Sequence, residues 1–177
     1  MPDFIFPPMP PVSVAIHGRE ACFPVHRVYC VGKNYAEHAR EMGSDPDREA
    51  PCFFSKPADA VVPGLGEIPY PPGSSNVHHE IELVAALGAG GRNLSPEQAL
   101  DRVVGYAVGV DMTRRDLQHA AKDRGQPWDT AKGFDYSAPI SPITMVEHGS
   151  DLQRGRIWIE VNGEIRQDAD ISDMTWN

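Results

Sequence analysis

The stretch RIWIEVNGEIRQ, residues 156–167, gives the clearest local indication of the fold class. Asn162 and Gly163 can both adopt the positive φ angles that a type I′ turn requires. The flanking segments Arg156–Val161 and Glu164–Gln167 are therefore predicted to pair as a β-hairpin.

Outward from this hairpin, most of the remaining segments also favour strands. They are β-branched, aromatic or apolar runs between turn residues: Val12–Ile16, Arg27–Val31, His79–Leu87 and Val103–Asp111. The sequence therefore predicts a mostly β domain with a few short helices, of the α+β class, and no alternating βαβ pattern.

Helix signals are few. Ser95 to Gln98 form a capping box with proline at N1, which predicts a helix from there to about Val103. Thr113 is the expected cap of a second helix, Arg114 to about Arg124, with Gly125 as its C′ residue. A third helix is expected over Tyr35–Met42.

The overall composition excludes several classes of function. The chain has 177 residues, which suits one domain, and its 16 basic and 25 acidic residues give a net charge of −9. This acidity argues against nucleic-acid binding, and no apolar run is long enough to predict a membrane span or a signal peptide. Three cysteines without a CxxC pair predict buried, reduced thiols and a cytoplasmic location.

Three carboxylates form the most informative group. On a strand Glu80 and Glu82 point to the same face, and Asp111 ends what we expect to be a neighbouring strand. An all-oxygen site of this kind suits Mg²⁺ or Mn²⁺ better than zinc. The alternative is a solvated strand face without a ligand.

Two further groups could take part in chemistry. If the segment is helical, His38 and Glu41 are i, i+3 neighbours, and a carboxylate beside an imidazole suits a general base acting on water. Lys132, between small residues near a loop, and Lys56, after two aromatic residues, could each approach a ligand. The alternatives are a surface ion pair and solvated lysines.

Taken in order, six segments resemble the fumarylacetoacetate hydrolase family. The resemblance covers about Val28 to Trp176, after an N-terminal segment of residues 1–26, so the catalytic domain is expected over residues 27–177. The segments are GKNYAEH, PCFFSKP, HHEIELVAALG, GYAVGVDMTRRDLQ, PWDTAKGFD and VNGEIRQD. This family likeness implies a twisted, mostly β roll that assembles as a homodimer.

The resemblance also implies roles for individual residues. The divalent metal, Mg²⁺ or Mn²⁺, would be bound by Glu80, Glu82 and Asp111. Catalysis would fall to a water-activating dyad and a lysine facing the substrate, namely His38, Glu41 and Lys132. Further substrate-binding groups would be Arg115 and Gln118 of the RDLQ element, together with Lys56.

The activity implied is hydrolysis of an acylpyruvate, with fumarylpyruvate as the first choice of substrate. Water activated by His38 would attack the distal carbonyl, and the bond would break to leave a pyruvate enolate stabilised by positive charge. Two alternatives keep the metal without the water: oxaloacetate decarboxylation and enol–keto isomerisation of a related diacid. A third, from another class, is a non-catalytic remnant that only binds a ligand.

Family members usually continue beyond the VNGEIRQD hairpin with a helix and more strands. We therefore expect the chain ending at Asn177 to be a truncated form that is inactive or poorly folded. Its metal site could still form even where catalytic turnover is lost. A helix is expected to begin within Ile171–Trp176, capped by Ser172 or Asp173. The alternative is a natural short form completed by a partner chain.

Overall fold

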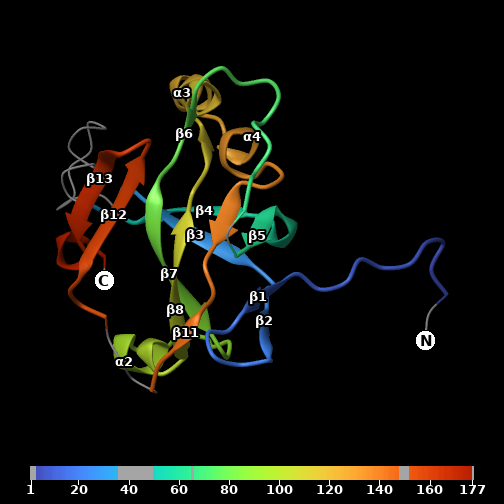
Figure 1. Cartoon of the computed structure of the whole chain (residues 1–177), viewed down its shortest axis with the longest axis vertical. Coiled ribbons are helices and arrows are strands. Elements are labelled where there is room, and N and C mark those ends of the chain that lie inside the picture. Colours follow the sequence, from blue (N-terminus) through green and yellow to red (C-terminus); the bar gives the residue numbers. More distant parts are fainter. Residues whose placement is uncertain (1–2, 36–49, 65, 148–151, 177) are drawn as a thin grey trace.

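A computed structural model describes residues 3–35, 50–64, 66–147 and 152–176. Its centre is a five-stranded sheet built around the long strand β8 (Val103–Val110) (Figure 1). One edge of β8 pairs antiparallel with β7 (Ile81–Leu87), and the other pairs with β10 (Ala138–Ile140) and β11 (Thr144–Met145). The fifth strand, β5 (Val61–Pro63), joins β10 in parallel.

Small residues on the buried face of β8 allow this double pairing. Alternate residues of the strand are buried, among them Gly105, Ala107 and Gly109. A Cβ at Gly105 would lie 2.6 Å from the carbonyl oxygen of Thr144, so the β11 backbone can approach only because no side chain is present. The apolar core lies on this face: Val14, Val61, Ala86, Ala107, Ala138, Ile140 and Ile143.

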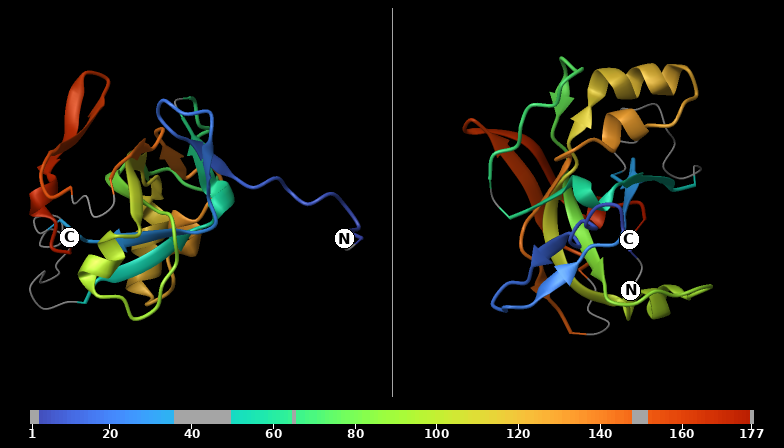
Figure 2. Two further views of the ribbon diagram at one scale, coloured as in Figure 1. Left: turned by 90° about the horizontal axis from the view of Figure 1, so that it is seen from below. Right: turned by 90° about the vertical axis from the view of Figure 1, so that its right-hand side faces the viewer.

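In the described part of the chain, four two-stranded sheets surround the central one (Figures 1 and 2). They are β1 (Ser13–Ala15) with β2 (Cys22–Pro24), β3 (Val28–Gly32) with β4 (Cys52–Lys56), β6 (Val77–His78) with β9 (Thr113–Arg114), and β12 (Arg156–Val161) with β13 (Glu164–Asp170). The last pair is the predicted hairpin, and the positive φ angles of Asn162 and Gly163 confirm its turn. The mostly β, α+β prediction is therefore confirmed.

The helices depart from their predicted extents. The capping box at Ser95 is present, but α2 (Pro96–Leu100) ends early because Val103 already belongs to β8. Helix α3 (Arg115–Asp123) has Gly125 at φ +62°, as predicted, whereas Thr113 is wrong as its cap because it lies in β9. The short α4 (Asp129–Lys132) was not predicted.

Two further predictions need correction. The helix expected to begin within Ile171–Trp176, with Ser172 or Asp173 as its cap, is wrong. The segment forms a 3-10 turn, η2 (Ile171–Asp173), which is capped by Asp170 and followed by extended backbone at Met174. A second short 3-10 turn, η1, spans Ala58–Ala60. All three cysteines are free, but the expectation that they are buried is wrong for Cys22, which is exposed, and holds only in part for Cys30 and Cys52, which are half-buried.

Candidate functional site

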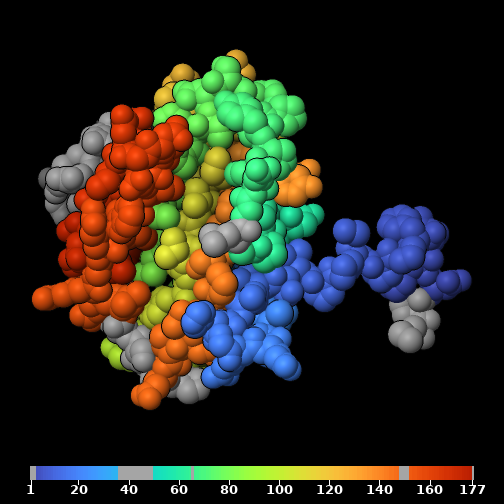
Figure 3. Space-filling model, viewed as in Figure 1, coloured from blue at the N-terminus to red at the C-terminus, as the bar shows by residue number. Residues whose placement is uncertain are grey.

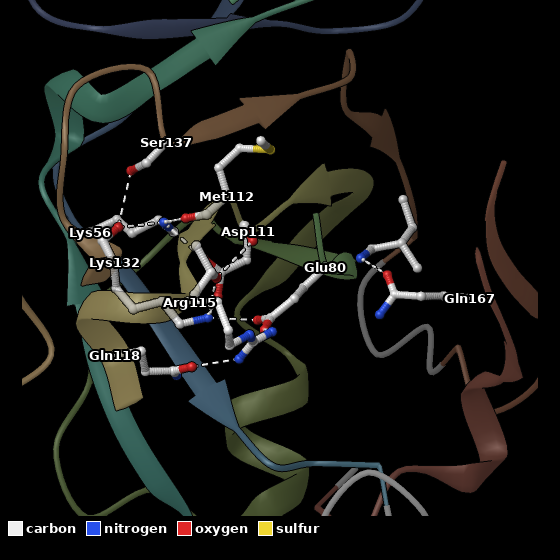
Figure 4. Close-up of polar contacts among 11 residues, drawn as sticks. Lys56, Glu80, Asp111, Met112, Arg115, Gln118, Lys132, Ser137 and Gln167 are labelled. Carbon is white, nitrogen blue, oxygen red and sulfur yellow. Dashed lines mark hydrogen bonds and ion pairs between the residues drawn. The ribbon is translucent and has the colours of Figure 1, made fainter. Parts of the chain in front are cut away.

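Two of the predicted carboxylates meet where β7 begins and β8 ends. Glu80 directly precedes β7 and Asp111 directly follows β8, and antiparallel pairing makes them neighbours: the Asp111 amide donates to the Glu80 carbonyl at 2.8 Å. Their side chains turn toward a common cluster of lysine and arginine groups (Figure 4). Strand pairing thus brings together acids that are 31 positions apart in the sequence.

Lys132, the last residue of α4, lies between these two acids. Its Nζ atom is 2.6 Å from Glu80 Oε2, 2.7 Å from Asp111 Oδ2 and 2.7 Å from the hydroxyl of Thr113. The side chain is almost entirely buried, and its ammonium also lies 4.9 Å from the ring centre of Phe54. A buried ammonium with three oxygen neighbours has a fixed position, which is what a catalytic cation requires.

Lys56, the last residue of β4, approaches Asp111 from the other side. Its Nζ atom lies 2.8 Å from Asp111 Oδ1 and donates to the carbonyl oxygens of Met112, at 3.1 Å, and Lys132. These contacts join the strand β4, the residues after β8 and the end of α4. The ammonium thus faces protein groups, and the expected contact of Lys56 with substrate stays a prediction.

Helix α3 contributes a third cation through its first residue. Arg115 uses Nη2 to pair with Glu80 Oε1 and Nη1 to donate to Gln118 Oε1, one helical turn along. Both side chains are buried, with exposed fractions of 8% and 4%. The RDLQ element therefore lies beside the acidic pair, and the expected contact of Arg115 and Gln118 with substrate stays a prediction.

Glu82 differs from the other two acids. Among the residues that the structure describes, it accepts no hydrogen bond and forms no ion pair. Burial, and then the charges of Asp111 and Glu80, raise its pKa to about 8. Glu82 is thus a buried carboxyl group that has no positively charged partner among the described residues.

The other titratable groups follow from the same balance of burial and pairing. Burial alone would raise the pKa of Glu80, but Lys132 and Arg115 outweigh it and hold the value at about 2. Burial raises the pKa of Asp111 and lowers that of Lys56 against the pull of their mutual ion pair. Burial and the charge of Asp111 raise the pKa of the Cys30 thiol to about 12, so this thiol stays protonated.

The donor set has the chemistry of a site for a hard divalent cation. Asp111 Oδ1 is buried and accepts no hydrogen bond despite its short contact with Lys56, and Glu82 has unused acceptors. Within the described ranges, however, no three acidic, histidine or cysteine side chains stand close enough together to hold an ion as they are. The Lys132 ammonium lies between two of the acids, so binding by all three requires these side chains to shift. The carboxylate oxygens of these three acids are nevertheless the kind of ligand that such an ion prefers, and those of Glu82 have no partner among the described residues.

The water-activating dyad cannot be located. His38 and Glu41 lie outside the described residues, so their predicted role remains untested. One group was missed from the sequence: Thr113, assigned as a helix cap, instead accepts a hydrogen bond from the Lys132 ammonium through its hydroxyl oxygen. Its place two residues after Asp111, on the same face of an extended chain, was the available signal.

Comparison with known families places the chain. The profile of the fumarylacetoacetate (FAA) hydrolase C-terminal family matches residues 27–177. The chain belongs to the fumarylacetoacetate hydrolase family.

Similar proteins within the family carry different activities. A crystal structure of fumarylpyruvate hydrolase from Pseudomonas aeruginosa, in complex with Mn²⁺ and pyruvate, is 52% identical, with a TM-score of 0.94 over 98% of this chain and 76% of that one. The mitochondrial oxaloacetate tautomerase of Bos taurus is 41% identical over 85% of this chain and 67% of its own. The mitochondrial oxaloacetate decarboxylase of Dictyostelium discoideum is 38% identical over 85% and 69%. The chain thus spans about two thirds of the length of these curated relatives.

These relatives bear on two further expectations. The crystallised hydrolase holds Mn²⁺, which agrees with a divalent metal and leaves the choice between Mg²⁺ and Mn²⁺ open. In the described residues no helix is long and apolar enough to cross a membrane. Because some relatives are mitochondrial, the cytoplasmic location remains a prediction.

Proposed function

We propose that this chain carries the active site of a divalent-metal-dependent hydrolase that cleaves a carbon–carbon bond in an acylpyruvate, with fumarylpyruvate as the first candidate. The observation that carries the proposal is the buried cluster in which Lys132 bridges Glu80 and Asp111. The 52% identity to a fumarylpyruvate hydrolase, against 38–41% to the oxaloacetate enzymes, supports this substrate class.

The charge of the cluster suits a dicarboxylate substrate. Its described members are three acids and three bases, whose formal charges cancel: Glu80, Glu82, Asp111, Lys56, Lys132 and Arg115. A bound divalent ion would leave a local charge of +2, which complements a substrate with two carboxylates such as fumarylpyruvate.

Each residue has a distinct part in the proposed reaction. Glu80, Glu82 and Asp111 would hold the ion, which when bound polarises the keto oxygen and offsets the charge that develops there. Lys132 would supply a second positive charge for that oxygen. Arg115 uses two of its five N–H donors in the contacts above, which leaves others for a substrate carboxylate.

The bond-breaking step needs water and a base. His38, supported by Glu41, would remove a proton from water as its oxygen adds to the carbonyl farther from the 2-oxo acid group. The bond between that carbonyl carbon and the methylene carbon next to the 2-oxo group then breaks. The electron pair of this bond forms the enolate of pyruvate. Protonation gives pyruvate, and the other fragment leaves as a carboxylic acid.

Oxaloacetate decarboxylation or tautomerisation is the second candidate, because relatives with those activities are 38–41% identical. Both reactions pass through an enolate, and neither needs the activated water. The same three acids and Lys132 would therefore serve them.

Product analysis separates the candidates. The protein would be incubated with fumarylpyruvate, shorter acylpyruvates and oxaloacetate, each with Mg²⁺, Mn²⁺ or excess chelator. We expect pyruvate and the matching acid from acylpyruvates in a metal-dependent reaction, with a value for kcat/KM that exceeds that for oxaloacetate. Carbon dioxide release or tautomerisation as the faster reaction would contradict the hydrolase proposal.

A further inference from the structure

The hairpin β12–β13 reaches the site through one side chain. It lies along one side of the molecule, next to β7, and forms a separate two-stranded sheet (Figures 1 and 3). From β13 the side-chain oxygen of Gln167 accepts a hydrogen bond from the amide of Ile81 at 2.8 Å (Figure 4). Ile81 stands between the two glutamates of the candidate metal site.

The geometry of β7 explains why this amide needs a partner. Successive N–H groups of a strand point to opposite edges. Strand β8 serves the residues on either side of Ile81, since Asp111 donates to the carbonyl of Glu80 and the register pairs Glu82 with Gly109. The Ile81 amide therefore points to the other edge of β7, where an unpaired N–H would be costly if buried.

The hairpin is shaped to supply that partner. Its register shifts where Ile159 opposes Gln167 and Glu160 opposes Ile165, so Arg166 is an extra, bulged residue. Such bulges re-aim neighbouring side chains and are common beside active sites. Gln167 is half-buried, whereas the residues on either side of it, Arg166 and Asp168, are exposed and lie in surface ion pairs.

We propose that Gln167 is a positioning residue, which fixes the backbone between Glu80 and Glu82 so that their carboxylates can act together on the metal. The inference rests on the proposed metal-dependent function. It gives the hairpin a role: Gln167 binds the backbone amide of Ile81, between two proposed ligands, on the edge of β7 that pairs with no strand of the described part of the chain. Loss of such an outer contact typically weakens metal binding by 10–100-fold.

The test compares Gln167→Met, which keeps the size of the side chain but removes the amide oxygen, with Gln167→Glu, which keeps an acceptor. Asp168→Asn is the matched control, because it alters the neighbouring position of the same strand and only a surface ion pair. Amide exchange at Ile81 is measured in the metal-free proteins, and Mn²⁺ affinity by calorimetry. Thermal unfolding verifies that each variant is folded.

We expect Gln167→Met to expose the Ile81 amide to exchange and to weaken Mn²⁺ binding by at least tenfold, with an unfolding temperature close to that of Asp168→Asn. Gln167→Glu should restore the protection of Ile81. Faster exchange with unchanged Mn²⁺ affinity would overturn the proposal and leave Gln167 a purely structural contact. No change in either quantity would also overturn it. If the unaltered protein binds no Mn²⁺, the proposed function itself fails, and that outcome is distinguished because it appears before any substitution.

Discussion

At the scale of single residues, Glu82 predicts an unusual dependence of stability on pH. Its pKa of about 8 in the folded protein lies above the ordinary value of 4.5, so the folded state favours the protonated acid. The stability that this gives is complete below about pH 4.5 and is lost as the pH rises through about 8. We expect the metal-free protein to unfold at lower denaturant concentration at pH 8.5 than at pH 6.

Glu82→Gln provides the control for this prediction, since glutamine stays neutral at every pH. Denaturant unfolding of both proteins in excess chelator, between pH 5.5 and 9, gives the measurement. The variant should show a flatter dependence and gain stability at the alkaline end. Equal pH dependence in the two proteins would show that Glu82 has an ordinary pKa.

Lys56 provides a second test at this scale. The side chain is 2% exposed and forms an ion pair with Asp111. Two carbonyl oxygens also accept hydrogen bonds from its ammonium. Breaking one side of a buried ion pair costs about 3–5 kcal/mol, so Lys56→Met should lower the free energy of unfolding by roughly this amount. Arg92→Met, at an exposed position outside the helices and strands, should change it by less than about 0.5 kcal/mol. Similar small losses from both variants would contradict the structural role of Lys56.

Which residues form the site could be predicted from the sequence, whereas the contacts between them could not. Six of the nine predicted residues lie in one buried cluster, because strand pairing and the motifs around them fix their neighbourhood: Lys56, Glu80, Asp111, Arg115, Gln118 and Lys132. Glu82 lies beside them and forms no ion pair with any residue that the structure describes. Which cation pairs with which acid depends on side-chain geometry across four elements, and no local pattern encodes that. Gln167 was quoted in a motif, but its contact with Ile81 spans 86 positions.

At the scale of elements, the turn of the hairpin can be tested by one substitution. Gly163 has φ +84°, and a Cβ there would meet no atom within 4 Å, so any cost of Gly163→Ala comes from the backbone conformation. A left-handed conformation costs a non-glycine residue roughly 1–2 kcal/mol, and we expect a loss of stability of that size. Gly90→Ala is the matched control, because that site is equally open but has no positive φ.

Unfolding measured by denaturant distinguishes these two glycines. A loss at Gly163 together with little change at Gly90 would support the type I′ turn. Equal effects at both sites would mean that the hairpin turn adapts or that it does not form as described.

Elements with a strong local signal were predictable, and those set by distant partners were not. The hairpin, β7, β8, α2 and α3 follow from turn residues, apolar runs and a capping box in their own sequences. The strands β4, β5 and β10 and the short α4 were missed, since three to five residues carry too little pattern. Thr113 was wrongly assigned as a cap because its extended conformation comes from pairing with His78, 35 positions away.

At the scale of the whole molecule, the ends of two strands of the central sheet carry the acids, while α3, α4 and β4 carry the cations. The homodimer and the substrate class remain predictions. The proposed function depends most on one further prediction, that Glu80, Glu82 and Asp111 together bind a divalent ion.

Calorimetric titration of Mn²⁺ into the metal-free protein at pH 8 tests this claim most directly, with Glu82→Ala and His38→Ala titrated alongside it. Glu82 is the informative position because it has no partner among the described residues, so its loss should leave the fold intact. We expect one ion per chain, with binding retained in His38→Ala and weakened by at least about tenfold in Glu82→Ala. Unchanged affinity in Glu82→Ala, or no binding by the unaltered chain, would contradict it.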